Sequence, residues 1–221
     1  MITSLNINNI FDLVLDQMRN FYPDRQPVDN TLVRKALDIA LERLEVCFEN
    51  IENDYYRRNQ QPYFNHLHTD HWCSFLWFLS NQLHNISNHH RDAAKLFGLN
   101  KTLHGIDAFY SLELPDIFLF VHPIGTILGR AKYSNYLVIY QNVTVGGDME
   151  NNYPEFGESI ALMSKSSVIG SCIIGNDVWF SANSMIHKSN VPNNSIVFGT
   201  YPNNTIKTSK KSIKNKFFLT T

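Results

Sequence analysis

The sequence has few cysteines, a low net charge and no long apolar run. Its 221 residues include three cysteines without metal-type spacing, so we expect no disulfide framework and a reducing cytoplasm. Nineteen basic and 20 acidic residues give a net charge of −1. This balance argues against nucleic-acid binding, because phosphates need a cationic face. The apolar runs are far shorter than the roughly 20 residues of a transmembrane helix, and Asp12 and Asp16 argue against a signal peptide.

Glycine is also scarce in the first half of the chain. Only Gly98 of the ten glycines precedes residue 105, and the other nine lie between Gly105 and Gly199. Because glycine disfavours helix interiors and suits turns, the architecture should change near residue 100. The sequence therefore predicts a helical domain over residues 1–104, a second domain over 105–205 and a basic C-terminal tail over 206–221.

The first half shows the apolar spacing of amphipathic helices. Three- and four-residue steps predict a helix over residues 30–53, with Asp29 or Asn30 as its cap. The run over residues 72–79 is interpreted as core or subunit interface. Further helices are expected over residues 7–21, 69–83 and 89–97.

The second half has a six-residue period. Counting back from Ile186, apolar side chains fall at Phe180, Ile174, Val168 and Leu162. Small or compact residues follow four places after the apolar ones, at Ser184, Val178, Cys172 and Ser166. A period of six predicts a solenoid in which three hexads make one three-sided coil, while an ordinary β-sandwich is the alternative. The same frame upstream gives Val143, Leu137 and Ala131, with a slip of one residue expected around residues 148–157.

Three segments of this repeat carry a family resemblance. Residues 122–147 begin with a histidine and end in a Gly-Gly pair, residues 158–186 hold regular hexads, and residues 190–201 contain VPNNSIVFGTYP. Together they resemble the hexapeptide-repeat acyltransferases and, within that group, serine acetyltransferases. The resemblance covers roughly residues 105–205. It implies an α+β fold, in which an N-terminal helical domain precedes a left-handed parallel β-helix.

Acetyl transfer to a hydroxyl needs a base, a group that orients the base, and a donor for the oxyanion. His122 is the candidate base, since imidazole titrates near neutral pH. Asp107 precedes it by a little less than one such coil, and the resemblance matches the two residues to a catalytic dyad. The alternatives are a buried structural histidine and a turn or capping aspartate after Gly105.

The resemblance also implies the acetyl donor and its binding mode. The donor would be acetyl-CoA, bound between neighbouring subunits of a homotrimer, and the helical domain leaves a larger assembly open. Gly147, Ser164 and Ala182 match the small residues that face the pantetheine arm, and an amide at Gly146 is a candidate oxyanion donor. Lys207 opens a basic run that either reaches the CoA phosphates or forms a solvated tail.

The acceptor side departs from the serine acetyltransferase pattern. The family places an aspartate before the histidine and an Arg-His pair before a later proline, whereas this chain has Val121 and the pair Asn152–Tyr153. Serine would lack both ionic partners, which disfavours its binding. We therefore expect a sugar or polysaccharide hydroxyl as acceptor, with Val121 and Tyr153 at its site. The alternatives are a true serine acetyltransferase of cysteine biosynthesis and a non-catalytic trimeric scaffold.

A histidine cluster precedes the predicted third helix. His66, His68 and His71 surround Asp70, and imidazole and carboxylate are zinc ligands. However, the spacing lacks the i, i+4 pair of helical zinc sites. We expect no metal and interpret the cluster either as ordinary surface or as a polar helix start facing the acceptor pocket.

Overall fold

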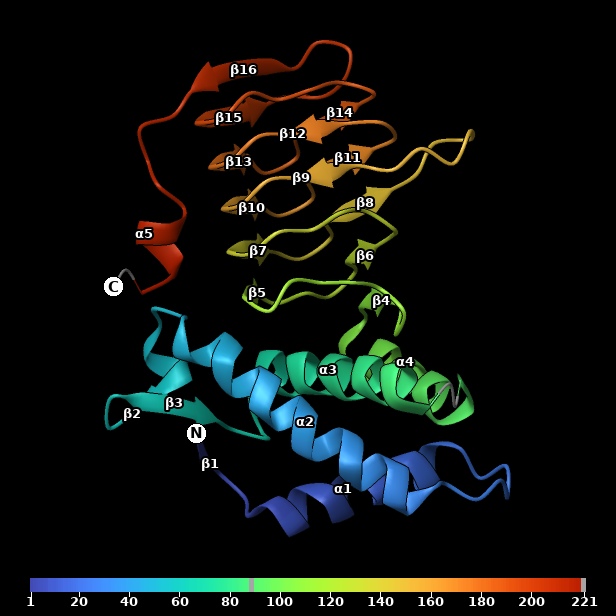
Figure 1. The fold of residues 1–221 in the computed structure, drawn as a ribbon. Helices are drawn as coiled ribbons and strands as arrows, with labels where there is room; N and C mark the ends of the chain where they lie inside the picture. The colour runs from blue at the N-terminus through green and yellow to red at the C-terminus, as the bar shows by residue number, and fades with distance from the viewer. Residues whose placement is uncertain (88–89, 220–221) are drawn as a thin grey trace. The chain divides into compact units, whose positions relative to one another are not determined.

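A computed structural model describes residues 1–87 and 90–219 of the chain (Figure 1). Contacts between residues divide it into two compact units. Unit 1 comprises residues 1–49 and 54–111, and unit 2 comprises residues 50–53 and the chain from residue 112 onward. Within the described residues, no helix has the length and apolarity that a membrane span requires.

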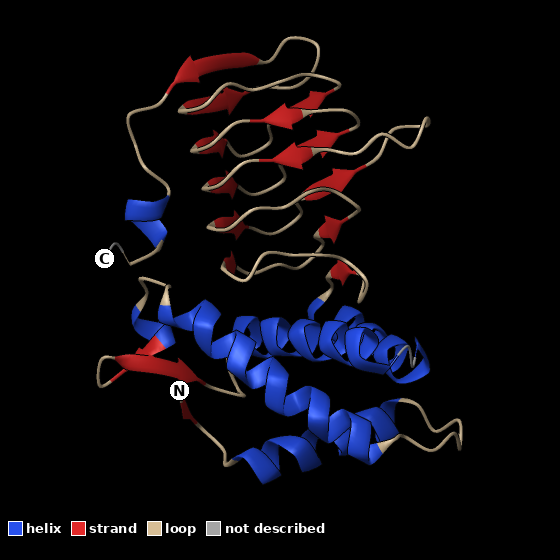
Figure 2. Cartoon of the chain, viewed as in Figure 1, coloured by secondary structure: helices blue, strands red, loops and turns tan. Residues whose placement is uncertain are grey.

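Unit 1 is built on four helices, shown in blue in Figure 2: α1 (Ile7–Phe21), α2 (Asn30–Glu49), α3 (Thr69–Ser87) and α4 (His90–His104). The predicted helix over 7–21 is confirmed, and the Asn6 side chain caps it by accepting a hydrogen bond from the Asn9 amide at 2.9 Å. Helix α2 ends four residues before the predicted end. Helix α4 passes through Gly98 and continues seven residues beyond the expected end, whereas residue 89 lies outside the described part of the chain.

The apolar stretch of α3 forms the core of unit 1. Phe75, Leu76 and Phe78 are completely buried, so the run over residues 72–79 is core. Helix α3 packs against both α2 and α4. Because the buried side chains occupy nearly every position in this stretch, the helix lies at the centre of the unit rather than on its surface.

Unit 1 also contains short strands that the sequence did not predict. Strand β3 (Gln61–Phe64) pairs in parallel with β1 (Ile2–Thr3) and antiparallel with β2 (Arg57–Arg58), which follows the 3₁₀ helix η1 (Asp54–Tyr56). A further two-residue strand, β4 (Asp107–Ala108), comes after α4. Strands of two to four residues are too short to show the alternating pattern by which a strand is predicted.

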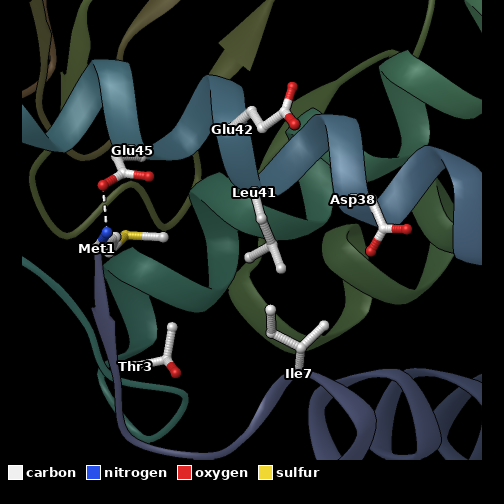
Figure 3. Close-up of a pocket in the computed structure, with 7 residues that line it drawn as sticks. All are labelled: Met1, Thr3, Ile7, Asp38, Leu41, Glu42 and Glu45. Carbon is white, nitrogen blue, oxygen red and sulfur yellow. Dashed lines mark hydrogen bonds and ion pairs between the residues drawn. The ribbon is translucent and has the colours of Figure 1, made fainter.

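A small hollow lies between β1, α1 and α2. Its volume is about 290 Å³, and Figure 3 shows Ile7 and Leu41 among the side chains that line it. The other walls are largely acidic, with Asp38, Glu42 and Glu45 on α2. The Met1 amino group forms an ion pair with Glu45 across one end of the hollow.

Unit 2 is a parallel β-helix, whose stacked short strands are visible in Figure 2. One face consists of β5 (Phe118–Phe120), β7 (Leu137–Ile139), β10 (Ile160–Leu162), β13 (Val178–Phe180) and β15 (Ser195–Phe198). A second face contains β6 (Ile127–Leu128), β8 (Thr144–Gly146), β11 (Ser167–Ile169) and β14 (Met185–His187). The third pairs β9 (Glu155–Phe156) with β12 (Ile173–Ile174), while β16 (Thr205–Thr208) runs antiparallel along β15 and α5 (Lys214–Phe217) follows it. The predicted α+β class is thus confirmed.

The hexad period sets the register of these coils. Val178 pairs with Ile160, Ile186 with Val168, and Ile173 with Glu155, each one regular coil of three hexads apart. The residues predicted to point inward are buried, and so are the small residues at the corner: Leu162, Val168, Phe180, Ile186, Ser166 and Ser184 are all at 0 % exposure. Each coil therefore stacks an apolar core on the coil beneath it.

The frame predicted upstream of residue 148 is wrong. Leu137 pairs with Ile160 and Val145 with Val168, so this coil is longer than a regular one by an insertion of five. The extra residues form a loop around residues 147–154, and the frame shifts by five positions rather than one. Val143 precedes Thr144, which pairs with Ser167, so Val143 is level with Ser166 and not with Leu162.

Candidate functional site

His122 lies two residues after the end of β5, at the first corner of its coil. Its backbone is left-handed, with a φ of 48°, and the residue is exposed. The next strands of the same face are β7, β10 and β13, and two residues after their ends come Gln141, Ser164 and Ala182. Because parallel strands stack in register, these four residues share one corner, at a spacing of roughly 4.8 Å per coil. We call this row the His122 corner.

Backbone hydrogen bonds fix the register of the His122 corner. The Lys165 amide donates to the Gln141 carbonyl and the Asn183 amide to the Ser164 carbonyl, each at 3.0 Å. Of the predicted site residues, the structure thus brings His122, Ser164 and Ala182 to one corner. Ser164 is half-buried and Ala182 exposed, and their small side chains lie two and three coils from His122 along this corner.

The predicted partner of the imidazole lies in the other unit. Asp107 belongs to β4 of unit 1, where its carboxylate accepts a 2.6 Å charged hydrogen bond from the Lys101 side chain. His122 belongs to unit 2. The pairing of Asp107 with His122 therefore stays a prediction.

Gly146 and Gly147 lie at a different corner from His122 within one chain. Gly146 ends β8, and Gly147 opens the five-residue insertion. A Cβ on Gly147 would approach Tyr153 Cε1 to 2.6 Å, so this position must be glycine for the ring to pack there. A Cβ on Gly146 would meet only Ile169, at 3.5 Å. The structure thus brings two predicted site residues together, Gly147 and Tyr153, away from the His122 corner of the same chain.

The inserted loop is held by one carboxylate. Asp148 accepts hydrogen bonds from the Glu150 and Asn152 amides at 2.9 and 3.0 Å, and it pairs with Lys188 at 3.1 Å. The Asn152 amide contributes most to lowering the pKa of Asp148 well below its usual value. This network fixes the loop, which borders a pocket of about 450 Å³ lined by Arg130, Ala131, Lys132, Asn151, Asn152, Tyr153, Pro154, Glu155 and Ser171.

Val121 is half-buried beside the histidine, and its amide donates to the Ile139 carbonyl at 2.9 Å. An apolar side chain here offers no ionic partner to a charged acceptor. Lys207 lies on β16, distant in register from the His122 corner, with its ammonium 5.9 Å from the centroid of the Phe198 ring. Within the described part of the chain, the structure therefore does not place Lys207 next to Ser164 or Ala182.

The histidine cluster is part of the packing of unit 1. His71 is completely buried, and its Nδ1 accepts a hydrogen bond from the Asn65 amide at 3.2 Å. His66 Nδ1 lies 2.8 Å from the Ser4 hydroxyl. Burial, and then the neighbouring His68, lower the pKa of His71 to about 3. In the part of the chain that the structure describes, no three His, Cys, Asp or Glu side chains are grouped as a metal site.

Sequence reasoning missed Gln141, which occupies the His122 corner one coil from the imidazole. Gln141 follows His122 in sequence at almost the length of a regular coil, and this spacing could have indicated that the two residues share a corner. The side-chain oxygen of Gln141 is buried without a hydrogen-bond partner among the described residues. A buried amide oxygen without a partner is energetically unfavourable.

Comparisons with known proteins agree with the sequence resemblance. No protein-family model matches the chain. A serine acetyltransferase of Staphylococcus epidermidis is 25 % identical over 123 residues, which cover 54 % of this chain and 57 % of that relative. The match thus spans little more than half the length of the curated relative.

Solved structures establish the fold more broadly. A serine acetyltransferase from Brucella abortus superposes with a TM-score of 0.69 at 17 % identity, covering 93 % of this chain and 85 % of that one. A serine acetyltransferase in complex with CoA gives a TM-score of 0.65 at 14 % identity, covering 88 % and 82 %. The resemblance to serine acetyltransferases is therefore confirmed in sequence and in fold.

Proposed function

We propose that this protein is an O-acetyltransferase that moves an acetyl group from acetyl-CoA to an acceptor hydroxyl. One observation carries the proposal: an exposed imidazole shares a corner of the β-helix with the small side chains of Ser164 and Ala182. Small side chains let an extended chain such as pantetheine approach the backbone. The similarity to serine acetyltransferases, one of them a CoA complex, supports the same donor.

In the proposed reaction, His122 removes the proton from the acceptor hydroxyl while that oxygen attacks the thioester carbonyl. The tetrahedral intermediate then collapses and expels the CoA thiolate, which takes the proton back from the imidazolium. Asp107 orients the imidazole and stabilises its charged form. The amide of Gly146 or Gly147 is proposed to stabilise the oxyanion. All three cysteines are buried thiols outside any disulfide, and their burial favours direct transfer over an acyl-cysteine intermediate.

The proposed active assembly is a homotrimer. Gly147 and Tyr153 lie at a different corner of the chain from His122, so a site that uses all three residues needs two copies. We propose that His122, Ser164 and Ala182 of one subunit face the loop of the next, with acetyl-CoA between them. Three cysteines that form no disulfide fit a reducing cytoplasm, which we propose as the location.

The proposed acceptor is a sugar hydroxyl, either on a small molecule or on a polysaccharide unit. Val121 and Tyr153 leave an amino acid without ionic partners at the positions that the resemblance assigns to its charges. The pocket beside Tyr153 offers amide and hydroxyl groups from Asn151, Asn152 and Ser171, next to Arg130 and the ion pair of Lys132 with Glu155. Such groups suit an acceptor with several hydroxyls. The competing candidate is a true serine acetyltransferase, which the curated relative's name favours.

The dyad is tested by replacing each of its members. We expect His122→Ala to lower kcat/KM by roughly 10²–10⁴-fold, because the general base is lost. Asp107→Asn should lower kcat with little change in the KM for acetyl-CoA. Asp116→Asn removes another carboxylate, from the chain between Asp107 and His122, and serves as the matched control. Wild-type turnover by His122→Ala, measured by release of the CoA thiol, would refute the base assignment.

The two alternatives, a serine acceptor and a non-catalytic scaffold, need separate measurements. Thiol release with serine and with a panel of sugars separates the two acceptor classes, and turnover on serine alone would reject the saccharide acceptor. A non-catalytic scaffold predicts no stabilisation by acetyl-CoA. An enzyme that binds acetyl-CoA should instead gain about 2.7 kcal/mol of stability when the ligand concentration is 100 times its Kd. This gain is measured as a rise in Tm.

A further inference from the structure

The C-terminal strap, residues 205–218, crosses one face of the β-helix from β16 to α5 (Figure 1). It is pinned at both ends and in the middle. The Ser209 amide donates to the Asn194 carbonyl at 2.7 Å, and the Ile213 amide donates to the Asp177 carboxylate at 2.8 Å. Ile213 and Phe218 are buried, at 0 % and 1 % exposure. The residues between these anchors are thereby held over the sheet.

A recess of about 560 Å³ lies between the strap and the sheet. Trp179 on β13 and Ile196 on β15 form its apolar floor, and the indole nitrogen of Trp179 donates to the Lys211 carbonyl at 2.9 Å. The strap contributes Ser209, Lys211, Ser212, Asn215 and Lys216. The volume falls within the range of small-molecule sites, about 300–1,000 Å³.

The strap carries a concentration of positive charge in a chain that is nearly neutral. It holds five lysines, and no acidic residue occurs between residue 205 and residue 221. Lys207 and Lys214 lie over the rings of Phe198 and Tyr136, at 5.9 and 4.2 Å from the centroids. Lys211 and Lys216 line the recess, and no acidic side chain of the described residues pairs with either. Both ammonium groups are exposed and available to an anion.

The hydroxyl groups of the recess complement these cations. Ser209 accepts a hydrogen bond from the Lys211 amide at 3.2 Å, and Ser212 accepts one from the Asn215 amide at 3.3 Å. Each hydroxyl therefore retains its hydrogen for a ligand oxygen. Ammonium and hydroxyl donors suit phosphate, and an indole face suits a planar ring.

We propose that this recess binds a nucleotide, with its base against Trp179 and its phosphates on Lys211 and Lys216. A simple anion would leave the aromatic floor unused, and an apolar ligand would leave two ammonium groups without partners. Two sources carry this chemistry: the nucleotide end of CoA, and a separate nucleotide such as that of a nucleotide-linked sugar. Only the identification with CoA rests on the proposed function.

Binding is measured on the full chain with ADP as the probe, and with adenosine and pyrophosphate as its two halves. Trp72 and Trp77 are buried in unit 1, so quenching of Trp179 reports on the recess. We expect ADP to bind more tightly than either half. Lys211→Gln should weaken ADP by about tenfold to a hundredfold, through loss of a charged hydrogen bond. Lys210→Gln removes the same charge next in sequence, outside the recess, and should change affinity less than about threefold.

Each result decides the proposal. The proposal is supported if ADP quenches the fluorescence of the wild-type protein and this quenching disappears in Trp179→Phe. The affinity for ADP should also fall in Lys211→Gln but not in Lys210→Gln. Displacement of ADP by CoA then identifies CoA as the source, and co-binding identifies a separate nucleotide. Equal losses in Lys210→Gln and Lys211→Gln, equal affinity for pyrophosphate and ADP, or no binding of ADP would overturn it. None of these measurements requires acetyl transfer, so failure of the proposed function would not affect them.

Discussion

Hydroxyl residues occupy three levels of one buried corner in unit 2. Thr126, Ser166 and Ser184 are completely buried and share this register with Val143. The Thr126 hydroxyl donates to the Tyr140 carbonyl at 2.8 Å and accepts from the Val143 amide at 3.3 Å. The hydroxyls of Ser166 and Ser184 have no partner among the described residues. The corner therefore requires a compact side chain but not, at every level, a polar one.

This difference predicts opposite effects of two similar substitutions. Ser166→Ala and Ser184→Ala should each raise the free energy of unfolding by about 1 kcal/mol, because an unsatisfied hydroxyl is removed from the interior. Thr126→Val should lower it by about 1–3 kcal/mol, because two backbone groups lose their partner. Urea denaturation measures both effects, provided that the m value stays constant. A loss in Ser166→Ala as large as that in Thr126→Val would contradict this account.

At the residue scale, the sequence indicated positions better than partners. The six-residue step located the buried Leu162, Val168 and Phe180, because an inward side chain recurs once per hexad. It could not show that Lys101 pairs with Asp107, since that contact depends on how α4 continues into β4. Nor could it show that Tyr153 packs on Gly147, because the course of the inserted loop is set by Asp148.

At the scale of elements, helix α3 begins beside a buried aromatic cluster. The ring of His71 lies 4.2 Å from that of Tyr56 and 4.1 Å from that of His68, measured between centroids, and Phe48 is 4.9 Å away. Burial, with a smaller contribution from His68, holds the pKa of His71 at about 3. The folded protein therefore keeps this imidazole neutral at a pH where the unfolded chain would protonate it.

Helical unit 1 should consequently lose stability in mild acid. Between the unfolded pKa of His71, about 6.5, and the folded value of about 3, the unfolded state binds one more proton. Stability is complete above that window and falls as the pH decreases, by up to about 1.4 kcal/mol per pH unit from this group. His71→Phe should remove that slope between pH 6.5 and pH 5, even if it lowers stability overall.

The measurement is urea unfolding followed by the fluorescence of Trp72 and Trp77 in a Trp179→Phe background, so that only unit 1 reports. His66→Gln is the matched control, because His66 is only half-buried and its imidazole bonds to the Ser4 hydroxyl. It should retain the pH slope of the parent protein. If His71→Phe retained that slope as well, the buried imidazole would not be its source.

The elements that the sequence located are those with sustained periodicity. Helix α1 and the coils after residue 155 repeat their pattern long enough to be recognised. Strands β1, β2 and β3 were not predicted because four residues or fewer show no period. In addition, Pro62 within β3 argues against a strand. The longer coil that contains the inserted loop was misjudged because two apolar pairs there fit a six-residue step: Leu137 with Val143, and Ile139 with Val145, of which the second pairs with Leu162 and Val168.

At the scale of the whole molecule, the β-helix leaves large apolar side chains in solvent. Ile124 is 63 % exposed and Ile127 on β6 is 49 % exposed, both close in sequence to His122, while Ile173 on β12 is 61 % exposed. Scattered exposed isoleucines are ordinary, but two beside a proposed active corner fit a surface that another subunit covers. Burial of these isoleucines against another subunit would add hydrophobic stabilisation that a single chain does not have.

The proposed homotrimer therefore predicts a specific dissociation. Wild-type protein should elute with three times the 25.5 kDa mass of the chain in size-exclusion chromatography with light scattering. The double variant Ile124→Glu/Ile127→Glu should elute as a single chain with an unchanged circular dichroism spectrum, because buried carboxylates without partners disfavour the interface. Ile7→Glu places the same charge at an exposed isoleucine of unit 1 and should leave the trimer intact. Thermal stabilisation by acetyl-CoA should disappear with the trimer, since the donor is proposed to lie between subunits. A single-chain mass for the wild type, or a double variant that remains trimeric, would show that this surface is not the interface.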